Sequence, residues 1–593
     1  MNCRQLFRGM ITVVLCLAAV ISTGRAQTTW YVDDNAPDDP GAGDPTVSDP
    51  LEDGTEAHPF DAIQEGVDAA STGDTVRVAP GTYRGAGNIE IDFHGKGIEI
   101  RGGQDWYHSC VIDCEYSGRA FYFHTNETNA ASVWNLSITH FSASSAAEGA
   151  VTSIDASPRF LSCGFRNCEG SAFYSEGGAP VIGSCTFSRN TGDVIHCKGG
   201  EPWIAGRYIE ENWGRVIYCE DADVRIESCE ITANVSCSGS HGVIDCRNCD
   251  VTVVDCVISR NAGAGWGGIA VISGKVLIDR CEISHNLTLD EYCGGAISLA
   301  DVEGVILNSR IEWNLGGWIG GGFNSEQCDC SIVNCVFARN ETLLVGGAIC
   351  SWSDRRMAIS NCTIVDNLSE DAVGGIYCED MHGDLTMLNC IVRDNVSEYP
   401  VQIGCGAGED TTASASIAFC DIQGERDSFD SNGNVVLDWG PGNFDADPLF
   451  VDGPFGDYRL AAGSPCIDVG CNCGMPEDSS DLDGDGAIHE FVPYDLENQG
   501  RFFDDPDTPD PAGSITPVVD IGAYEYGGST VPPVLGDLNG DRSVTLDDLA
   551  VLLAHYGLAE IAEAADGDLN CDGNVDLDDL AGILARYGQG APG

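Results

Sequence analysis

Positive charge is scarce in this 593-residue chain, which has 29 lysines and arginines against 93 aspartates and glutamates and a formal net charge of −64. A chain this acidic would be repelled by nucleic acid and by anionic membranes, so the sequence argues against both as partners. Divalent cations are its natural counter-ions. Outside the loops described below, we interpret the carboxylates as a solvated surface, which is their usual role.

Long apolar runs are also rare, and the one that occurs lies at the N-terminus. Arg4 and Arg8 precede the apolar stretch 10–21, and small residues precede Gln27, which is the layout of a secretory signal peptide. We therefore expect residues 1–26 to be a signal peptide and the mature protein to be secreted, extracellular or associated with the cell surface. No later segment is long enough to span a bilayer as a helix, so no membrane-spanning segment is predicted.

Cysteines are abundant, yet their number does not suit complete pairing. Two of the 29, Cys3 and Cys16, lie in the predicted signal peptide, and the remaining 27 are an odd number in a protein expected to enter an oxidising compartment. Their spacing follows a repeat, C-x-I/F-x-x-N, whose steps run from 22 residues (163 to 185) to 30 (390 to 420). The motif begins at Cys163, Cys185, Cys229, Cys256, Cys281, Cys335, Cys362 and Cys390, and Arg207 and Ser309 keep its register without cysteine.

Repeats of this length predict a solenoid. Each repeat is too short for a pair of helices and alternates Val, Ile and Cys between Gly and Asn, which predicts a parallel β-helix over residues 73–460. We expect the apolar and cysteine side chains to point inward and the recurrent Asn to lie at a turn, where stacked amides about 4.8 Å apart bond to one another. A second inward file is predicted at Cys197, Cys219, Cys246, Cys350 and Cys378.

The stacked cysteines are within disulfide range by Cα distance. Their Cβ vectors run parallel, however, which suits the disulfide dihedral poorly. We therefore interpret most of them as buried thiols that pack as small apolar groups.

The beginning of the solenoid region fits the same architecture. In the N-terminal segment 27–72, Phe60, Ile63 and Val67 recur at helical spacing, which predicts a short helix that caps the open end of the first coil. With the repeats that follow, the sequence resembles the pectin-lyase-like superfamily of right-handed β-helices, and the resemblance covers roughly Trp30 to Leu460.

An irregular acidic tail is predicted over residues 461–530. Four stretches in and before it resemble the end of the choice-of-anchor Q β-helix family, whose members end in varied C-terminal attachment modules. This resemblance implies much about fold and little about chemistry. The stretches are Asp445–Phe450, Tyr458–Leu460, Ser464–Asp468 and Asp520–Tyr526.

Catalytic motifs are missing. Lyases of the resembled superfamily abstract a proton beside a uronate with an Arg or Lys base while acidic residues hold Ca²⁺, and its polygalacturonases use N-T-D, G-H-G and R-I-K motifs. None of the latter set occurs in this chain, and residues 190–193 and 241–242 are only fragments. The catalytic residues are therefore unknown from the sequence, and it stays open whether the chain is an enzyme, such as a polysaccharide lyase or a glycoside hydrolase.

Two groups of outward residues have alternative interpretations. The residues before the recurrent Asn form either a strip for an acidic glycan or a solvated column of turns, which any repeat produces. This file contains Arg189, Arg260, Arg339, His285, Asp366 and Asp394. Tryptophans in Gly-rich turns would either stack on sugar rings or cover coil edges. They are Trp266, Trp313, Trp318 and Trp352.

Two near copies of an acidic loop follow a change of composition after Pro532 and Pro533, offset by 31 residues (537 to 568). Oxygen-bearing side chains fall at loop positions 1, 3, 5, 9 and 12, with a backbone carbonyl expected at 7, which is the arrangement that Ca²⁺ needs. Each loop runs into an amphipathic helix, over 549–556 or 580–587, that ends at a glycine. The predicted ligands are Asp537, Asn539, Asp541, Ser543, Thr545 and Asp548 in the first loop and Asp568, Asn570, Asp572, Asn574, Asp576 and Asp579 in the second.

This pair of loops closely resembles a type I dockerin. The resemblance implies that residues 534–593 form a small all-α domain with Ca²⁺ as its cofactor and a cohesin-like protein as its partner. Arg542 stands where Gly eases a sharp turn, and residues 546–547 and 577–578 are Leu-Asp where cellulosomal dockerins commonly place small hydroxyl residues. These differences bring the cohesin partner into question but not the calcium.

A third acidic loop, over residues 481–490, has the first oxygen ligands and the glycine of a calcium loop. Its position 12 is Val492, which cannot bind a metal, although Glu490 or Asp495 would be substitutes. This loop is either a third calcium site or an acidic turn.

The sequence therefore predicts a mainly β protein, a right-handed parallel β-helix with an N-terminal cap helix, followed by a small all-α dockerin-like domain. The favoured function is a secreted calcium-binding protein associated with extracellular polysaccharide, a lyase or glycosidase tethered by its C-terminal module. The alternative is a non-catalytic surface or adhesion protein that uses the solenoid as a binding scaffold. An exposed strand face with convergent Arg or Lys and several carboxylates would favour the enzyme, and scattered charges would favour the adhesin.

Overall fold

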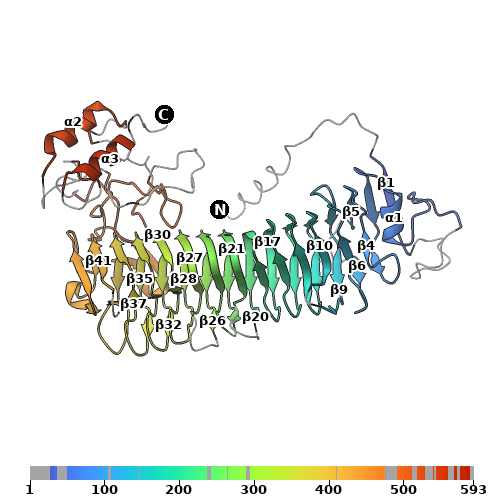
Figure 1. Ribbon diagram of the computed structural model, residues 1–593, viewed down its shortest axis with the longest axis horizontal. Coiled ribbons are helices and arrows are strands. Elements are labelled where there is room, and N and C mark those ends of the chain that lie inside the picture. Colours follow the sequence, from blue (N-terminus) through green and yellow to red (C-terminus); the bar gives the residue numbers. More distant parts are fainter. Residues whose placement is uncertain are drawn as a thin grey trace.

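The chain winds into a mainly β, elongated solenoid of about 13 turns of parallel strands, which Figure 1 shows as a rod. No helix in the described part of the chain is long and apolar enough to cross a membrane. The predicted signal peptide and the acidic loop 481–490 lie outside the described residues. The computed structural model describes residues 27–35, 50–103, 109–145, 147–236, 242–263, 265–288, 294–408, 411–472, 475, 491–509, 517–527, 538–539, 543–558, 567–569, 574–585 and 587.

Each coil consists of three strand segments separated by residues with positive φ. In one coil, Ser273 (φ 62°) bends β24 (Ile269–Asp279), Arg280 (φ 50°) separates it from β25 (Glu282–Ser284), and His285 (φ 56°) follows β25. A left-handed residue that carries a Cβ costs about 1 to 2 kcal/mol. Such bends persist because the strands stacked on both sides determine the path of the backbone.

The first sheet stacks one strand segment from every coil, and strand alternation divides each segment between core and surface. Ile195 pairs in register with Ile217, and both side chains point inward, while His196 and Tyr218 beside them point outward. The strands of this sheet are β4 (Ile91–Asp92), β7 (Phe121–Phe123), β10 (Gly149–Ile154), β13 (Ser171–Glu176), β16 (Ile195–Lys198), β18 (Ile217–Glu220), the first parts of β21 (Ile244–Val254), β24 and β27 (Ile297–Leu307), β29 (Phe323–Glu326), β33 (Ile349–Trp352), β37 (Ile376–Met381), β40 (Ile403–Ala407) and β43 (Phe429–Asn432).

The second sheet continues from the first after a bend, and in three coils one long strand serves both sheets. Val251 pairs in register with Val276 and Val276 with Gly304, and all three positions face the core. Its strands are β1 (Thr29–Val32), β2 (Thr75–Val78), β5 (Glu99–Arg101), β8 (Ser132–Trp134), β11 (Arg159–Leu161), β14 (Val181–Gly183), the first parts of β17 (Trp203–Glu210) and β19 (Asp223–Thr232), the second parts of β21, β24 and β27, β30 (Asp329–Val333), β34 (Arg356–Ser360), β38 (Asp384–Leu388), β41 (Ala413–Ala418) and β44 (Val435–Trp439).

The third sheet closes each coil, and the I/F position of the repeat supplies its inward side chains, such as Ile258 and Ile283. Its strands are β3 (Gly81–Tyr83), β6 (Cys110–Asp113), β9 (Ser137–Thr139), β12 (Gly164–Arg166), β15 (Thr186–Ser188), the second parts of β17 and β19, β22 (Val257–Ser259), β25, β28 (Arg310–Glu312), β31 (Val336–Ala338), β35 (Thr363–Val365), β39 (Ile391–Arg393) and β42 (Asp421–Ile422). Smaller elements are β20 (Val235–Ser236), β23 (Ala262–Gly263), β26 (Leu287–Thr288), β32 (Glu341–Thr342), β36 (Leu368–Ser369), β45 (Phe450–Asp452), β46 (Asp457–Leu460) and the 3₁₀ turns η4 (Glu425–Ser428) and η5 (Gly453–Phe455).

A ladder of asparagine amides runs along the interior edge of the solenoid, as the repeat predicts. Asn190 donates from its Nδ2 to Oδ1 of Asn212 (3.0 Å) and to the carbonyl oxygen of Phe165 (3.1 Å), and its own Oδ1 accepts from the Cys168 N–H (3.0 Å). Each buried amide therefore satisfies both donors and its acceptor, which removes the cost of burying it. The ladder passes through Asn190, Asn212, Asn234, Asn261, Asn286, Asn314, Asn340, Asn367 and Asn395 and ends on Gln402.

The cysteine files lie in the core as buried thiols. Among the described residues, 22 cysteines are free and all of them are buried, which confirms the interpretation made from the repeat. Cys471, beyond the solenoid, is disulfide-bonded. The predicted position of Cys350 was wrong, because it pairs in register with Tyr377 in an outward file while Ser351 takes the inward position beside Cys378. A shift of one residue along a strand moves a side chain to the other face.

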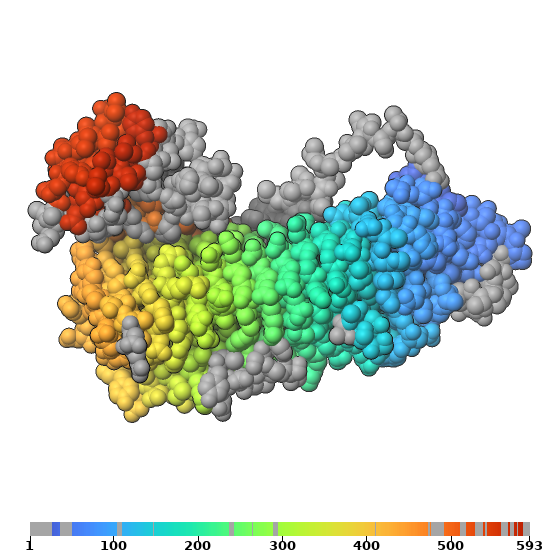
Figure 2. All heavy atoms as spheres, viewed as in Figure 1, coloured from blue at the N-terminus to red at the C-terminus, as the bar shows by residue number. Residues whose placement is uncertain are grey.

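Three helices flank the solenoid in the described residues. α1 (Ile63–Ala69) lies against β1 and β2, with Ile63 and Val67 buried in the solenoid core. That this helix caps the first coil stays a prediction. α2 (Leu546–His555) and α3 (Leu577–Ala585) pack together at the end of the solenoid that contains β41, where Figure 2 shows them as a red module beside the orange coils.

The chain after the last coil packs on the outer side of the third sheet. Tyr458 and Tyr524 share a buried apolar cluster with Val336 and Ile391 of β31 and β39. Side-chain amides at one turn of the solenoid bond to this tail: Asn334 donates to the carbonyl oxygen of Tyr494 (2.7 Å) and Asn389 to that of Cys471 (2.9 Å).

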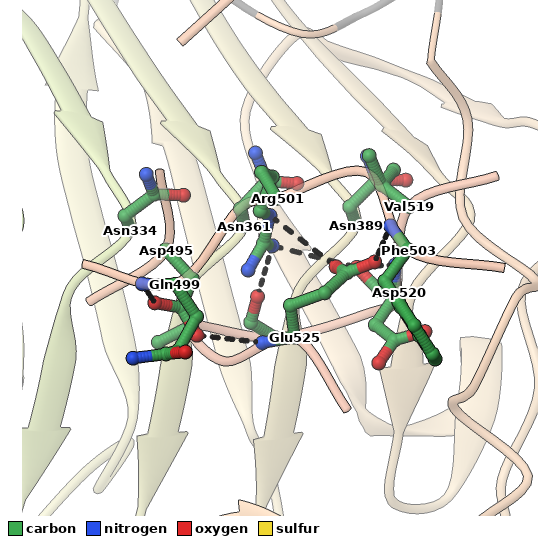
Figure 3. A network of polar contacts seen from close by, with 12 residues as sticks. Asn334, Asn361, Asn389, Asp495, Gln499, Arg501, Phe503, Val519, Asp520 and Glu525 are labelled. Atoms are coloured by element: carbon green, nitrogen blue, oxygen red, sulfur yellow. Dashed lines mark hydrogen bonds and ion pairs between the residues drawn. The ribbon is translucent and has the colours of Figure 1, made fainter. Parts of the chain in front are cut away.

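A buried polar network holds the tail together beside these asparagines (Figure 3). Oε1 of Glu525 accepts from the Phe503 N–H (3.0 Å), and Oε2 accepts from the Asp520 N–H (3.2 Å). Arg501 is fully buried and donates to the carbonyl oxygen of Gly522. Burial raises the pKa of Asp520 to about 7 and raises that of Glu525 well above its ordinary value.

Candidate functional site

The predicted calcium loops precede α2 and α3, and their twelfth residues make equivalent contacts. Oδ1 of Asp548 accepts from the N–H groups of the second and third loop residues (2.9 and 3.1 Å), and Oδ2 accepts from that of Thr545 (2.8 Å). In the second loop, Oδ1 of Asp579 accepts from the second residue (2.7 Å) and Oδ2 from Asp576 (2.8 Å). The two carboxylates thus tie the beginning of each loop to its ninth position.

The predicted ligand set is described in part. Asp537, Asp541, Asn570 and Asp572 lie outside the described residues, whereas Asn539, Ser543, Thr545, Asp548, Asp568, Asn574, Asp576 and Asp579 lie within them. Within that described portion no three His, Cys, Asp or Glu side chains are placed to hold a metal ion. The donors are oxygen atoms throughout, and Asp548, Asp568 and Asp579 are buried, which suits a hard cation. Calcium binding stays a prediction.

The outward file of turns is largely occupied by contacts within the protein. Arg189 pairs with Glu211 of the next coil (3.0 Å). Arg339 lies over the ring of Trp313 (4.9 Å to the centroid) and donates to the carbonyl oxygen of Gly453 in the tail (2.7 Å). Two of its three arginines therefore serve the solenoid and the tail, which favours the interpretation as a structural column.

A different cluster lies on the outer face of the first sheet, over β13, β16, β18 and β21. Tyr174, His196, Tyr218 and Asp245 follow one another in register from coil to coil. Two residues further along the same strands, a second outward file places alternating acids and bases beside them. It consists of Glu176, Lys198, Glu220 and Arg247.

His196 lies at the centre of this cluster and is 8% exposed. Its ring centroid is 5.1 Å from that of Tyr174 and 4.8 Å from that of Tyr218. Neither ring nitrogen has a hydrogen-bond partner within the described chain, since the nearer oxygen of Asp193 is 4.0 Å from Nδ1. Burial lowers the pKa of His196 from its ordinary 6.5, although the charge of Asp193 opposes the shift. Both ring nitrogens are buried from solvent, so a neutral imidazole here can accept a proton only from a ligand whose binding exposes one of them.

Arg215 occupies the carboxylate that would otherwise bind the imidazole. Its Nε and Nη2 donate to the two oxygens of Asp193 (2.6 and 2.5 Å), and its guanidinium carbon is 3.2 Å from the ring centroid of Tyr218. The bidentate pair is one of the stronger hydrogen-bonded ion pairs that side chains form. It holds Asp193 beside His196 without a direct bond between them.

Carboxylates accept hydrogen bonds from the neighbouring phenols. Tyr174 donates to Glu176 (3.1 Å), and Tyr218 donates to Glu220. Burial, with Glu176 beside it, raises the pKa of Tyr174 to about 12. Lys198 is 4.0 Å from Glu176, and both side chains are about half exposed. The cluster thus places a base, two protonated phenols and a solvent-facing cation on one face.

The cluster lies where the coils are shortest, and a column of glycines explains their length. Gly170, Gly192 and Gly214 have φ of 105°, 97° and 128°, and a Cβ on Gly214 would lie 2.2 Å from the carbonyl oxygen of Gly192. This turn carries the chain from the ladder to the first sheet over residues 212–217, about half the length of the link over 234–244 in the next coil. The tight turns are therefore confined to the short coils, and the next coil, which carries Asp245 at the end of the cluster, has the longer link.

His196 could not be recognised from the motif because the repeat draws attention to inward residues. Cys197 and Cys219 are inward, as predicted, and strand alternation then places His196 and Tyr218 outward. Strand alternation was therefore the one feature of the sequence that could have placed His196 on the outer face. The pairing of Asp193 with Arg215 depends on the stacking of successive coils, so spacing alone does not reveal it.

A second outer surface is a shallow groove of about 460 Å³ on the second sheet, over β21, β24, β27, β30 and β34. Lys275 is 3.3 Å from Glu303, and Arg356 is 2.7 Å from Asp329. Each cation of the groove thus faces a carboxylate of a neighbouring coil, which is the pattern of a solvated charge ladder.

The comparisons with known proteins agree with this architecture. The sequence profile of the right handed beta helix region matches residues 149–277 and 267–440. No curated protein matches the chain.

Solved structures with a similar fold include three that act on or bind carbohydrate by their titles. The mannuronan C-5 epimerase AlgE6 A-module of Azotobacter vinelandii is 12% identical, with a TM-score of 0.35, over 65% of this chain and 94% of that one. The PL6 family alginate lyase AlyGC is 12% identical, with a TM-score of 0.33, over 64% and 70%. XylC in complex with xylose is 8% identical, with a TM-score of 0.39, over 85% and 99%.

At these identities the likeness concerns the fold alone. The profile match spans all the coils that carry the asparagine ladder, and the register of the strands in three parallel sheets agrees with it. This chain is a right-handed parallel β-helix protein.

Proposed function

We propose that this chain is a secreted enzyme that modifies an acidic polysaccharide at the His196 cluster. The observation that carries the proposal is the buried imidazole of His196, whose ring nitrogens have no hydrogen-bond partner in the described chain and whose pKa is lowered by burial. Protonatable groups with perturbed pKa values in a polar cluster are candidates for catalysis. A strand face on which Lys and Arg converge with several carboxylates is the pattern expected of an enzyme rather than an adhesin.

The chemistry that suits these groups is β-elimination on a uronate polymer. Once substrate binding exposes a ring nitrogen between Tyr174 and Tyr218, His196 would accept the proton from the carbon beside the carboxylate. The electron pair of that C–H bond would form the new carbon–carbon double bond as the glycosidic C–O bond breaks. Tyr218, protonated and bonded to Glu220, would give its proton to the leaving oxygen. Lys198 would neutralise the substrate carboxylate, which makes the adjacent proton more acidic. No water or redox partner is consumed.

The test is an assay of the purified mature chain on a panel of uronate polymers and neutral glycans. Unsaturated products should appear with at least one uronate polymer, and new reducing ends should appear in equal number. Reducing ends without unsaturated products would show that the reaction is hydrolysis and not elimination. Absence of both with every polymer would refute the enzyme.

The C-terminal module is proposed to be a calcium-dependent attachment domain. Ca²⁺ would supply the counter-charge that lets the loop carboxylates approach one another, and the oxygen donors of both loops would hold it. The small core of Val544, Leu552, Leu569, Val575 and Ile583 supports this dependence, since so little apolar burial alone is weak support for a fold. Helicity of the isolated module should rise with Ca²⁺ and fall with chelator, and equal helicity in both conditions would contradict it.

A non-catalytic adhesin is the second candidate, and one observation favours it. Charges near the cluster are mutually paired, as in Arg215 with Asp193 and Arg247 with Asp245 (3.3 Å). Such pairs stabilise a surface without reacting. Retention of an acidic glycan on the immobilised chain, with no product from the same glycan, would decide for the adhesin.

A further inference from the structure

An exposed indole lies in the turn that leads into β18, two residues before Arg215. Trp213 is 59% exposed, although its backbone is rigidly held. Its N–H donates to the carbonyl oxygen of Asn190 (2.8 Å), and its carbonyl oxygen accepts from the Gly192 N–H (2.7 Å). Bridges to Thr191 and Val235 hold it from both neighbouring coils. The Cα–Cβ bond of Trp213 therefore has a fixed place at the surface, from which the indole extends into solvent.

Trp213 is connected to the catalytic candidates through a single glycine. Gly214 follows it with φ of 128°, and Arg215, which binds Asp193 and lies over the ring of Tyr218, comes next. Because a Cβ at Gly214 would meet the backbone of Gly192, this turn has one path. The backbone of Trp213 is therefore held at a constant distance from Arg215.

Other exposed tryptophans are engaged in contacts or lie farther from the cluster, as does Trp352, which is in the outward file of Arg247 but four coils beyond it. The ring of Trp313 stacks on His285 (6.1 Å between centroids, 13°) and lies under Arg339. Trp203 belongs to the same coil as Trp213, but it lies on the second sheet. Within the described part of the chain, no ring or cation contact involves Trp213, so its apolar face is the one left available near His196.

We infer that Trp213 is a specificity-determining platform that stacks on a sugar ring next to the ring bound at His196. Pyranose rings have an apolar C–H face, and an indole offers the widest apolar surface of any side chain with little loss of entropy on binding. Lys198, half exposed, flanks the cluster on the opposite edge of the strands, where it would take a carboxylate of an acidic glycan. The site accordingly selects polymers or oligomers long enough to cover both the cluster and Trp213. This inference rests on the proposed function.

The experiment compares the full mature chain with Trp213→Ala, Trp213→Phe and the matched control Trp203→Ala. On a reactive uronate oligomer, Trp213→Ala should raise KM about 3- to 10-fold with kcat within about twofold, because a stacking contact is worth about as much in the ground state as in the transition state. Trp213→Phe should recover most of the affinity, and Trp203→Ala should match the wild type. On the shortest oligomer that reacts, the difference should vanish.

A binding measurement separates this inference from the enzyme proposal. Quenching of tryptophan fluorescence by the same glycans is recorded with catalytically silenced His196→Ala, alone and combined with Trp213→Ala. Loss of the quenching and of affinity in the double variant supports the platform, even if no glycan is turned over. Equal KM and equal affinity with and without Trp213 would overturn the inference while leaving any measured activity intact.

Discussion

The short coils over residues 163–229 and the longer coils over 234–395 share a core and a ladder but not a surface. The ladder bond is 3.0 Å from Asn190 to Asn212 and 3.0 Å from Asn340 to Asn367. The outward file of the first sheet holds Tyr174, His196 and Tyr218 in the short coils. In the longer coils it continues through small residues such as Ala270 and Ser298 and reaches an aromatic side chain again only at Tyr377. The repeated positions therefore maintain the fold, and the positions between them are free to carry chemistry.

The largest expected effect separates the two regions by activity. Substitution of His196 by Ala should lower kcat/KM by about 10²- to 10⁴-fold, because general base catalysis contributes that much. The matched control is Ser298→Ala, at a buried position of the same outward file, which should leave kcat/KM unchanged. Steady-state kinetics on the reactive polymer measure both. A fully active His196→Ala variant would show that the active site is not at the His196 cluster.

The second effect concerns the turn that makes the coils short. Gly214→Ala should destabilise the protein by about 3 kcal/mol, since its Cβ would overlap the carbonyl oxygen of Gly192 at a positive φ. Gly85→Ala is the control, because Gly85 has φ of 70° with open space around it and should cost only about 1 kcal/mol. Urea unfolding followed by circular dichroism compares them. Equal costs would show that the glycine column does not constrain the short coils.

The third effect should be the same in both regions. Asn212→Ala and Asn340→Ala each leave neighbouring buried donors or acceptors unpaired and should each cost about 2 kcal/mol. Denaturant midpoints of the two variants, compared with the wild type, give the costs. A ladder that matters only among the long coils would appear as a near-neutral Asn212→Ala and would contradict the shared role inferred here.

The smallest effect is a pH dependence confined to the short coils. Because burial lowers the pKa of His196 below 6.5 in the folded protein, the unfolded chain binds more protons below that pH. The contribution of His196 to stability is complete above pH 6.5 and is lost as the pH falls from 6.5 through the folded pKa. Relative to His196→Gln, the wild type should lose up to about 1.4 kcal/mol per unit of pKa shift. Unfolding free energies of both proteins across this range test it, and a constant difference would count against a depressed pKa.

The repeat predicted the interior in detail, because core positions recur at every coil. Ile258 and Ile283 are inward and the asparagine amides are bonded, as expected from their spacing. Cys350 was misplaced because a cysteine one residue out of register looks the same in a spacing count. The surface could not be predicted in this way, since His196 and Arg215 have no equivalents in other coils.

By itself, the sequence determined the solenoid, its inward files and the ladder. These depend on periodicity and on the hydrophobic effect, and both are visible within each single repeat. It also predicted two calcium loops from their spacing. Only the tertiary structure decided that Asp193, His196, Arg215 and Tyr218 meet on one face, because residues of successive coils become neighbours through stacking about 4.8 Å apart. It also decided that the tail covers the third sheet, a contact between residues far apart in the chain that no local pattern encodes.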